Sequence, residues 1–147
     1  MRLLLSAKSF FILFLMTSCV SGLNINQERK LTGIKQEHPE LYQEDKSVGA
    51  AFAFGILPGG GSFYTRNYAI GVVDLLLWPI SVLWDPINGV NGANEINFYS
   101  SLSAIKRAKN KELEALKAEY VKDKITEKQY NIKKMEIEDK YDVEKNL

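Results

Sequence analysis

The feature that most constrains this chain is a central stretch, residues 48–103, that is almost free of charge. Its only fully charged side chains are Arg66, Asp74, Asp85 and Glu95. The flanking segments mix acidic and basic residues freely. Two apolar runs, 48–57 and 68–84, lie within the stretch, and a short Gly-rich connection joins them. Two apolar runs around such a turn predict a hydrophobic helical hairpin over residues 48–87.

The lengths of the two runs bear on how this hairpin meets a membrane. At 1.5 Å per residue, residues 48–57 make about 15 Å of helix and residues 68–84 about 25 Å. A bilayer presents about 30 Å of hydrocarbon, so the first run is too short to cross alone. We expect a spanning, re-entrant or interfacial membrane hairpin. The alternative is a soluble hydrophobic hairpin that is buried by oligomerisation.

Asp74 is the one acid inside the second run. A carboxylate in hydrocarbon costs several kcal/mol unless it pairs or faces water. We interpret Asp74 either as a residue on a solvent-exposed helix edge or as part of a polar path. Pro79, in the same run, predicts a kink or an end of the helix.

The connection carries an ordered motif. Residues 57–64, Leu-Pro-Gly-Gly-Gly-Ser-Phe-Tyr, resemble the Gly-x-Gly-x-Phe-Tyr core of the small two-transmembrane-helix domain family. Gly71 and the pair Trp84-Asp85 are similar to that family's second helix and its exit, whereas Asp74 lies outside the pattern. The resemblance implies membrane embedding and no reaction. The candidate residues of the membrane hairpin are Pro58, Gly59, Gly61, Phe63, Tyr64, Asp74, Trp84 and Asp85.

Residues 1–18 have the pattern of an export signal. A basic start precedes the apolar run 10–16, and small polar residues follow it up to Cys19, the single cysteine. Residues 15–19 resemble the lipobox of bacterial lipoproteins. The resemblance implies cleavage before Cys19 and a diacylglycerol on its sulfur. The alternatives are an uncleaved signal anchor and an ordinary signal with an incidental cysteine.

The rest of the chain is polar. Residues 19–47 predict a lipid-anchored tether or short irregular helices, and the turn-rich residues 88–101 predict a polar loop. Residues 102–147 carry apolar side chains at near-helical spacing and predict a charged amphipathic helical tail. Asp123-Lys124 interrupts this pattern, and Thr126-x-x-Gln129 predicts that a second helix starts with a capping box.

The tail is similar to the short C-terminal helical-hairpin domain known as SHOCT. The matching residues are Leu113-Glu-Ala-Leu116, the stretch Lys124-Ile-Thr-Glu-Lys-Gln-Tyr130, and Lys133-Lys134. The family usually carries Gly before Ile-Thr-Glu. Because Asp123-Lys124 takes that place here, we expect a weaker turn and a longer, straighter helix. The resemblance implies oligomerisation, and the alternative is a solvated charged helix without a partner.

The functional expectation follows from these segments and from what the chain lacks. One His, one Cys and scattered acids give no catalytic, cofactor or metal constellation. The near balance of 19 basic and 18 acidic residues gives no reason to expect nucleic-acid binding. We therefore expect a mainly α, non-enzymatic lipoprotein of the bacterial cell membrane that faces the periplasm. It would act through membrane lipid and a homo-oligomer or envelope protein partner. A small pore or transport accessory is the second hypothesis.

Overall fold

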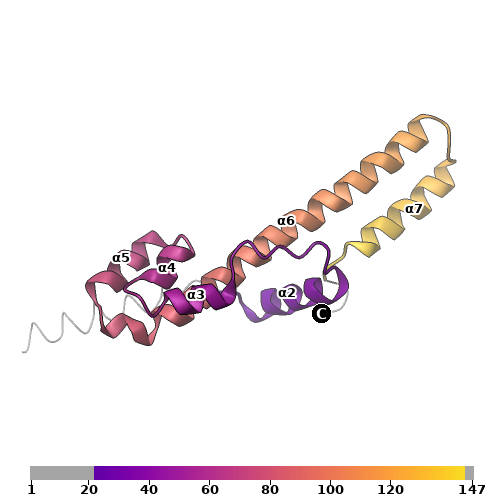
Figure 1. The fold of residues 1–147 in the computed structure, drawn as a ribbon. Coiled ribbons are helices and arrows are strands. Elements are labelled where there is room, and N and C mark those ends of the chain that lie inside the picture. Colours follow the sequence, from indigo (N-terminus) through magenta and orange to yellow (C-terminus); the bar gives the residue numbers. More distant parts are fainter. Residues whose placement is uncertain (1–21, 145–147) are drawn as a thin grey trace, which may run out of the picture. The chain divides into compact units, whose positions relative to one another are not determined.

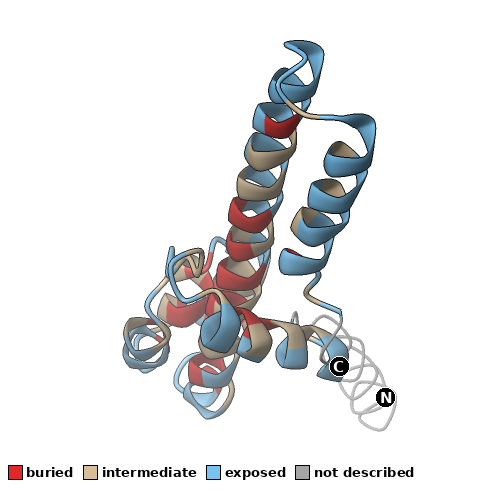
Figure 2. Cartoon of the chain, turned by 90° about the vertical axis from the view of Figure 1, so that its right-hand side faces the viewer, coloured by how far each residue is buried: buried red, intermediate tan, exposed pale blue. Residues whose placement is uncertain are grey.

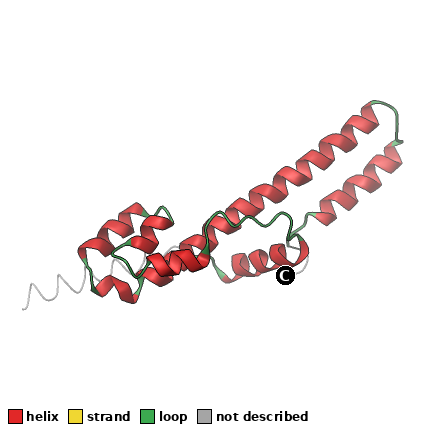
Figure 3. Cartoon of the chain, in the orientation of Figure 1, coloured by secondary structure: helices red, strands yellow, loops and turns green. Residues whose placement is uncertain are grey.

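The structure is a computed structural model that describes residues 22–144, and all regular structure in this range is helical. Its elements are α2 (Ile25–Glu37), α3 (Val48–Phe54), α4 (Gly60–Tyr64), α5 (Tyr68–Leu76), the 3-10 helix η2 (Ile80–Leu83), α6 (Asp85–Val121) and α7 (Glu127–Lys140). Figure 1 colours them along the sequence, and Figure 3 marks the helices in red and the connections in green. The predicted mainly α class is confirmed for this part of the chain. The predicted signal, residues 1–18, and Cys19 lie outside the described residues.

The described chain divides into two compact units. We call Ala51–Gly92 the hydrophobic unit, and Leu23–Ala50 together with residues 93–144 the charged unit. Each unit is described by itself below.

The hydrophobic unit contains more and shorter helices than the predicted two-helix hairpin. Gly59, with φ at 68°, takes the left-handed conformation before α4, and this turn separates α3 from the rest. The second apolar run is not one helix either, because α5 ends at Leu76 and η2 follows Pro79. The predicted break near Pro79 is therefore confirmed. Its cause is that proline has no N–H to donate into a helix.

Within residues 22–144, no helix is both long enough and apolar enough to cross a bilayer.

The polar loop predicted over residues 88–101 is wrong, because these residues lie inside α6, a single helix of 37 residues. The glycines that suggested turns are packing positions instead. A Cβ on Gly89 would lie 2.7 Å from the carbonyl oxygen of Ala51, and one on Gly92 would lie 2.8 Å from the Thr65 side chain. Glycine is tolerated inside this helix because neighbouring segments approach the helix closely.

The asparagines of this region are also structural. Asn97 is fully buried in the charged unit. Its side chain accepts from the Lys46 N–H at 2.9 Å and donates to the Lys46 carbonyl at 2.8 Å. The amide thus pairs with both backbone groups of Lys46, which fixes residues near 46 beside α6. This pairing explains a polar residue in the helix interior without a loop.

The charged unit has a small apolar core. Ile34, Ile105 and Tyr141 form its centre. The partly buried residues packed against them are Leu41, Tyr42, Leu102, Ala108, Ile137 and Val143. Figure 2 marks the buried positions in red, and on α6 those of this unit recur at helical spacing. The core explains why the predicted tether contains a regular helix, α2, with a capping box of Asn24 and Gln27.

The predicted start of α7 is confirmed, but the predicted straightening of the tail is wrong. Thr126 and Gln129 form the expected capping box. Asp123 has φ at 53° and takes the left-handed conformation usual for glycine. The chain therefore turns back, and α7 lies alongside α6 (Figures 1 and 2). The rings of Tyr120 and Tyr130 are 5.0 Å apart across this hairpin.

Candidate functional site

The hydrophobic unit exposes its large apolar side chains. They are Phe52, Phe54, Ile56, Leu57, Tyr68, Val72, Leu75, Leu76, Leu77, Trp78, Ile80, Val82, Leu83 and Ile87. Every helical element of the unit except α4 contributes to this set. No Leu, Ile, Val, Phe or Trp within residues 51–92 is buried. Soluble domains bury these residue types first, so the usual distribution is reversed here.

The interior of the unit is made of small and polar residues. The buried ones are Ala51, Gly55, Gly59, Gly61, Ser62, Thr65, Gly71, Asp74, Ser81, Asp85, Pro86, Gly89 and Gly92. Close backbone approach is the reason for the glycines. A Cβ on Gly55 would lie 2.3 Å from the Cα of Pro86, and one on Gly61 would lie 2.7 Å from the carbonyl oxygen of Asp85. Helices and turns of this unit therefore touch through their backbones.

The predicted motif residues serve this close packing. Phe63 lies over Gly71, where an added Cβ would come 2.8 Å from its ring. Tyr64 is tilted against Phe54, with 5.2 Å between ring centroids. Gly59 supplies the left-handed turn before α4, and Pro58, one residue earlier, is half-buried. The motif thus has a structural role that its residue types explain.

Asp85 accepts hydrogen bonds from backbone N–H groups at the start of α4, although it lies 23 residues after Ser62. Its side chain is fully buried. Asp85 Oδ2 accepts from the Gly61 N–H at 3.1 Å, and Oδ1 accepts from the Ser62 N–H at 3.0 Å. The first N–H groups of a helix have no partner inside the helix. Asp85 supplies one, which ties the beginning of α6 to α4.

Asp74 lies in the same cluster, and its predicted place on a solvent-exposed helix edge is wrong. Its side chain is 1% exposed. Asp74 Oδ1 accepts from the Trp84 indole N–H at 2.7 Å. Its other oxygen, Oδ2, lies 3.0 Å from Ser62 Oγ, which in turn lies 2.7 Å from Asp85 Oδ1. The Ser62 hydroxyl therefore stands between two buried carboxyl groups.

The electrostatics of this cluster favour a neutral Asp74. Burial raises the pKa of Asp74 above its ordinary value. The hydrogen bonds from Trp84 and Ser62 lower this pKa, and the nearby Asp85 raises it further, with a net increase. Arg66 is the only basic residue within 51–92, and it is exposed. It makes none of the hydrogen bonds of the cluster, so no basic residue within 51–92 compensates the two carboxyl groups.

The structure thus brings together three of the predicted residues, Asp74, Trp84 and Asp85, and adds Ser62. Ser62 is not among the residues predicted from the sequence. The signal for it was present, because two acids in an apolar stretch need donors and Ser62 is a hydroxyl beside the Gly-rich turn. The cluster can hold a proton. Among residues 22–144 no group of three or more His, Cys, Asp or Glu side chains is placed to hold a metal ion.

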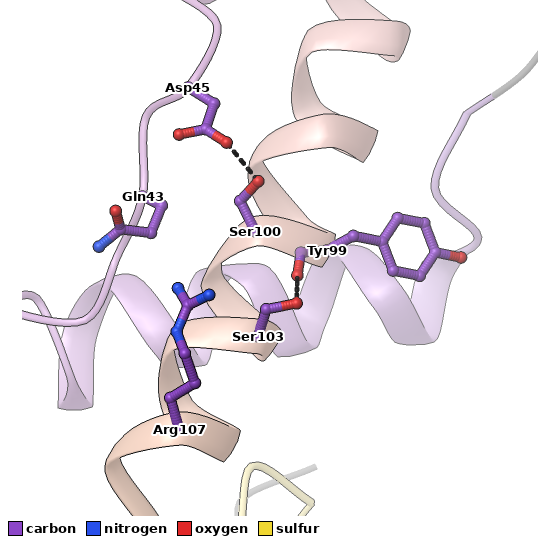
Figure 4. A pocket seen from close by; sticks show the side chains of 6 residues that line it. All are labelled: Gln43, Asp45, Tyr99, Ser100, Ser103 and Arg107. Carbon is purple, nitrogen blue, oxygen red and sulfur yellow. Dashed lines mark hydrogen bonds between the residues drawn. The ribbon is translucent and has the colours of Figure 1, made fainter.

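The charged unit has a hollow of about 330 Å³ that the sequence analysis did not foresee. Its lining residues are Gln43, Asp45, Tyr99, Ser100, Ser103 and Arg107. Figure 4 shows them: Ser100 donates to Asp45, and Ser103 donates to the Tyr99 carbonyl. Both serines are thus engaged in hydrogen bonds within the fold of the unit itself.

The chain matches no protein-family model, and it is similar to none of the curated proteins or solved structures compared with it.

Proposed function

We propose that this chain is a non-enzymatic, lipid-anchored protein of the bacterial envelope that acts through contacts with envelope proteins. The observation that supports the proposal is the reversed distribution of residues in the hydrophobic unit, which exposes large apolar side chains and buries small and polar ones. Fourteen large apolar side chains are exposed within residues 52–87. Exposed apolar surface on this scale marks an interaction with lipid or with protein.

Lipid is the environment that fits this surface best. The exposed side chains lie on α3, α5, η2 and α6 and in the turns at residues 56–57 and 77–78, so most of the unit contributes apolar surface. Within the described residues, every buried side-chain nitrogen or oxygen has a hydrogen-bond partner. A protein in hydrocarbon must also pair its polar groups internally, because hydrocarbon offers them no hydrogen-bond partner. A diacylglycerol on Cys19 would add a second membrane anchor to the chain.

The charged unit is the part proposed to meet other proteins. None of the α7 residues is buried. Ile132 and Met135 are exposed on this helix among charged side chains, at 43% and 62% of their surface. Apolar residues framed by charge are typical of a contact surface with a polar rim. A homo-oligomer or a second envelope protein is the proposed partner.

A membrane-association experiment tests the lipid part of the proposal. In the full chain, Cys19→Ala removes the acylation site, and we expect the protein to stay with the membrane fraction. Adding Leu75→Gln and Leu76→Gln should weaken membrane partitioning at least about a hundredfold, since each exposed Leu is worth about 1.5–3 kcal/mol on transfer. Val121→Gln, at 69% exposure in the charged unit, is the matched control. Release of Cys19→Ala alone into the soluble fraction would count against the proposal.

The partner contact has its own test. We expect Ile132→Glu with Met135→Glu to abolish cross-linked complexes in intact cells without loss of helix content. Lys128→Glu changes charge on the same helix and is the control. An unchanged cross-linking pattern in the double variant would contradict a contact through α7.

The pore or transport accessory remains a second candidate without a specific observation in its favour. Asp74, the residue expected to line its polar path, directs its oxygens at Trp84 and Ser62.

A further inference from the structure

The Ser62 hydroxyl lies close to two carboxyl oxygens but has only one hydrogen to share between them. A serine hydroxyl has one hydrogen to donate, and Ser62 Oγ lies within hydrogen-bond distance of both Asp74 Oδ2 and Asp85 Oδ1. The shorter of the two contacts, 2.7 Å, is to Asp85. If Ser62 donates there, its contact with Asp74 at 3.0 Å needs a hydrogen from the Asp74 side.

The titratable groups around Asp74 also favour a protonated Asp74 side chain. Asp74 on α5 contacts Ser62 of α4 and Trp84, which precedes α6, and Asp85 at the start of α6 lies close to it. The part of α3 in this unit has no titratable side chain. Asp85 already receives two backbone N–H groups and is used only as an acceptor. A second buried carboxylate beside it, without a cation, is costly.

We propose that the folded hydrophobic unit keeps one proton on Asp74, which donates to Ser62 Oγ while Ser62 donates to Asp85, and that loss of this proton loosens the unit. The device is a proton-sensitive lock between α4, α5 and the start of α6. It goes beyond the proposed function, because it holds whether the unit contacts lipid or protein.

The direction of the pH dependence follows from proton linkage. The pKa of Asp74 is raised in the folded unit relative to its ordinary value of 3.8. The folded state therefore binds the proton more tightly than the unfolded state does. Stability is greatest below about pH 4, falls as the pH rises towards the raised folded pKa, and is constant above it. A salt-bridged aspartate gives the opposite slope.

Asp74→Asn tests the proposal because asparagine mimics the protonated carboxyl. Its Oδ1 can still accept from Trp84, and its amide can donate to Ser62 in place of the acid O–H. The full chain is unfolded by denaturant in micelles between pH 4 and 8, with tryptophan fluorescence as the signal. Both tryptophans, Trp78 and Trp84, lie in the hydrophobic unit. We expect the wild-type midpoint to fall with rising pH and the Asp74→Asn midpoint to stay flat.

Two further measurements keep the test sharp. Asp45→Asn, an exposed aspartate of the charged unit, should keep the wild-type slope. The infrared difference spectrum between the wild type and Asp74→Asn should show the carbonyl stretch of one protonated carboxyl at the low-pH end of this range. A flat wild-type profile, an Asp74→Asn profile with the wild-type slope, or no protonated carboxyl band would each overturn the lock. Vesicle flotation, run in parallel, tests membrane contact separately.

Discussion

Replacing Asp85 with asparagine is the most informative single change in the hydrophobic unit. The Asp85 carboxylate accepts three hydrogen bonds from two residues: the N–H groups of Gly61 and Ser62, and the Ser62 hydroxyl. Asparagine keeps one oxygen and replaces the other with an NH₂ group, which can only donate. One backbone N–H at the start of α4 would then face a donor in a buried place.

The cost can be worked from these contacts. A buried donor left without a partner costs about 1–3 kcal/mol. The remaining bonds also lose the strength that a charged acceptor gives, since charge-assisted bonds are roughly twice as strong as neutral ones. We therefore expect Asp85→Asn to cost about 3 kcal/mol. At about 0.05–0.15 kcal/mol per residue, this loss is comparable to the whole stability of so small a unit.

The assay is denaturant unfolding of the full chain in micelles, followed by tryptophan fluorescence. Hydrogen exchange of the Gly61 and Ser62 amides gives a local signal, and both should exchange faster in Asp85→Asn. Asp45→Asn is the control, because the exposed Asp45 accepts one bond, from Ser100, and its loss should cost less than about 1.5 kcal/mol. A cost below 1 kcal/mol for Asp85→Asn, on the order expected of an ordinary surface bond, with unchanged amide exchange, would refute the reasoning.

Three further predictions concern packing and turns. Gly55→Ala should destabilise the hydrophobic unit by about 2 kcal/mol or more in the same assay, because its Cβ would lie 2.3 Å from a Cα at the start of α6. Gly49→Ala, whose added Cβ would meet only Ser47 Oγ at 4.0 Å, should be neutral or stabilising. In the charged unit, Asp123→Val should cost about 1–2 kcal/mol by thermal unfolding, since a β-branched residue fits φ at 53° poorly, whereas Asp123→Gly should not. Tyr141→Phe should cost about 1 kcal/mol in that melt, because Tyr141 is buried and donates to Glu112 at 2.7 Å.

Local patterns in the sequence predicted the local features of the fold. The helical class, the break at Pro79 and the capping box at Thr126 each depend on a few neighbouring residues, and all three are confirmed. The turn at Asp123 was located but expected to be weak. A short polar side chain reaches the left-handed conformation at small cost, and the resemblance to a glycine-bearing family did not convey this.

The features that failed depend on partners far along the chain. Residues 88–101 have turn-forming composition, and only the close approach of Ala51 to Gly89 shows why glycine suits a helix there. The environment of Asp74 depends on Ser62 and Trp84, which lie 12 and 10 residues away. No helical or strand period links such positions, so the sequence pattern could not group them into one cluster.

The reversed interior of the hydrophobic unit has a consequence for how its variation is read. In a soluble domain, a scan of all substitutions finds the tolerant positions on the surface and the intolerant apolar ones inside. Here we expect the outer positions of α5 and η2 to accept other apolar residues and to reject charge, whereas the buried Gly55, Gly61 and Ser62 should reject almost every change. If such a scan were interpreted by the rule for soluble domains, the exposed apolar surface would be assigned to the core, and the true core, because it is polar, would be assigned to the surface.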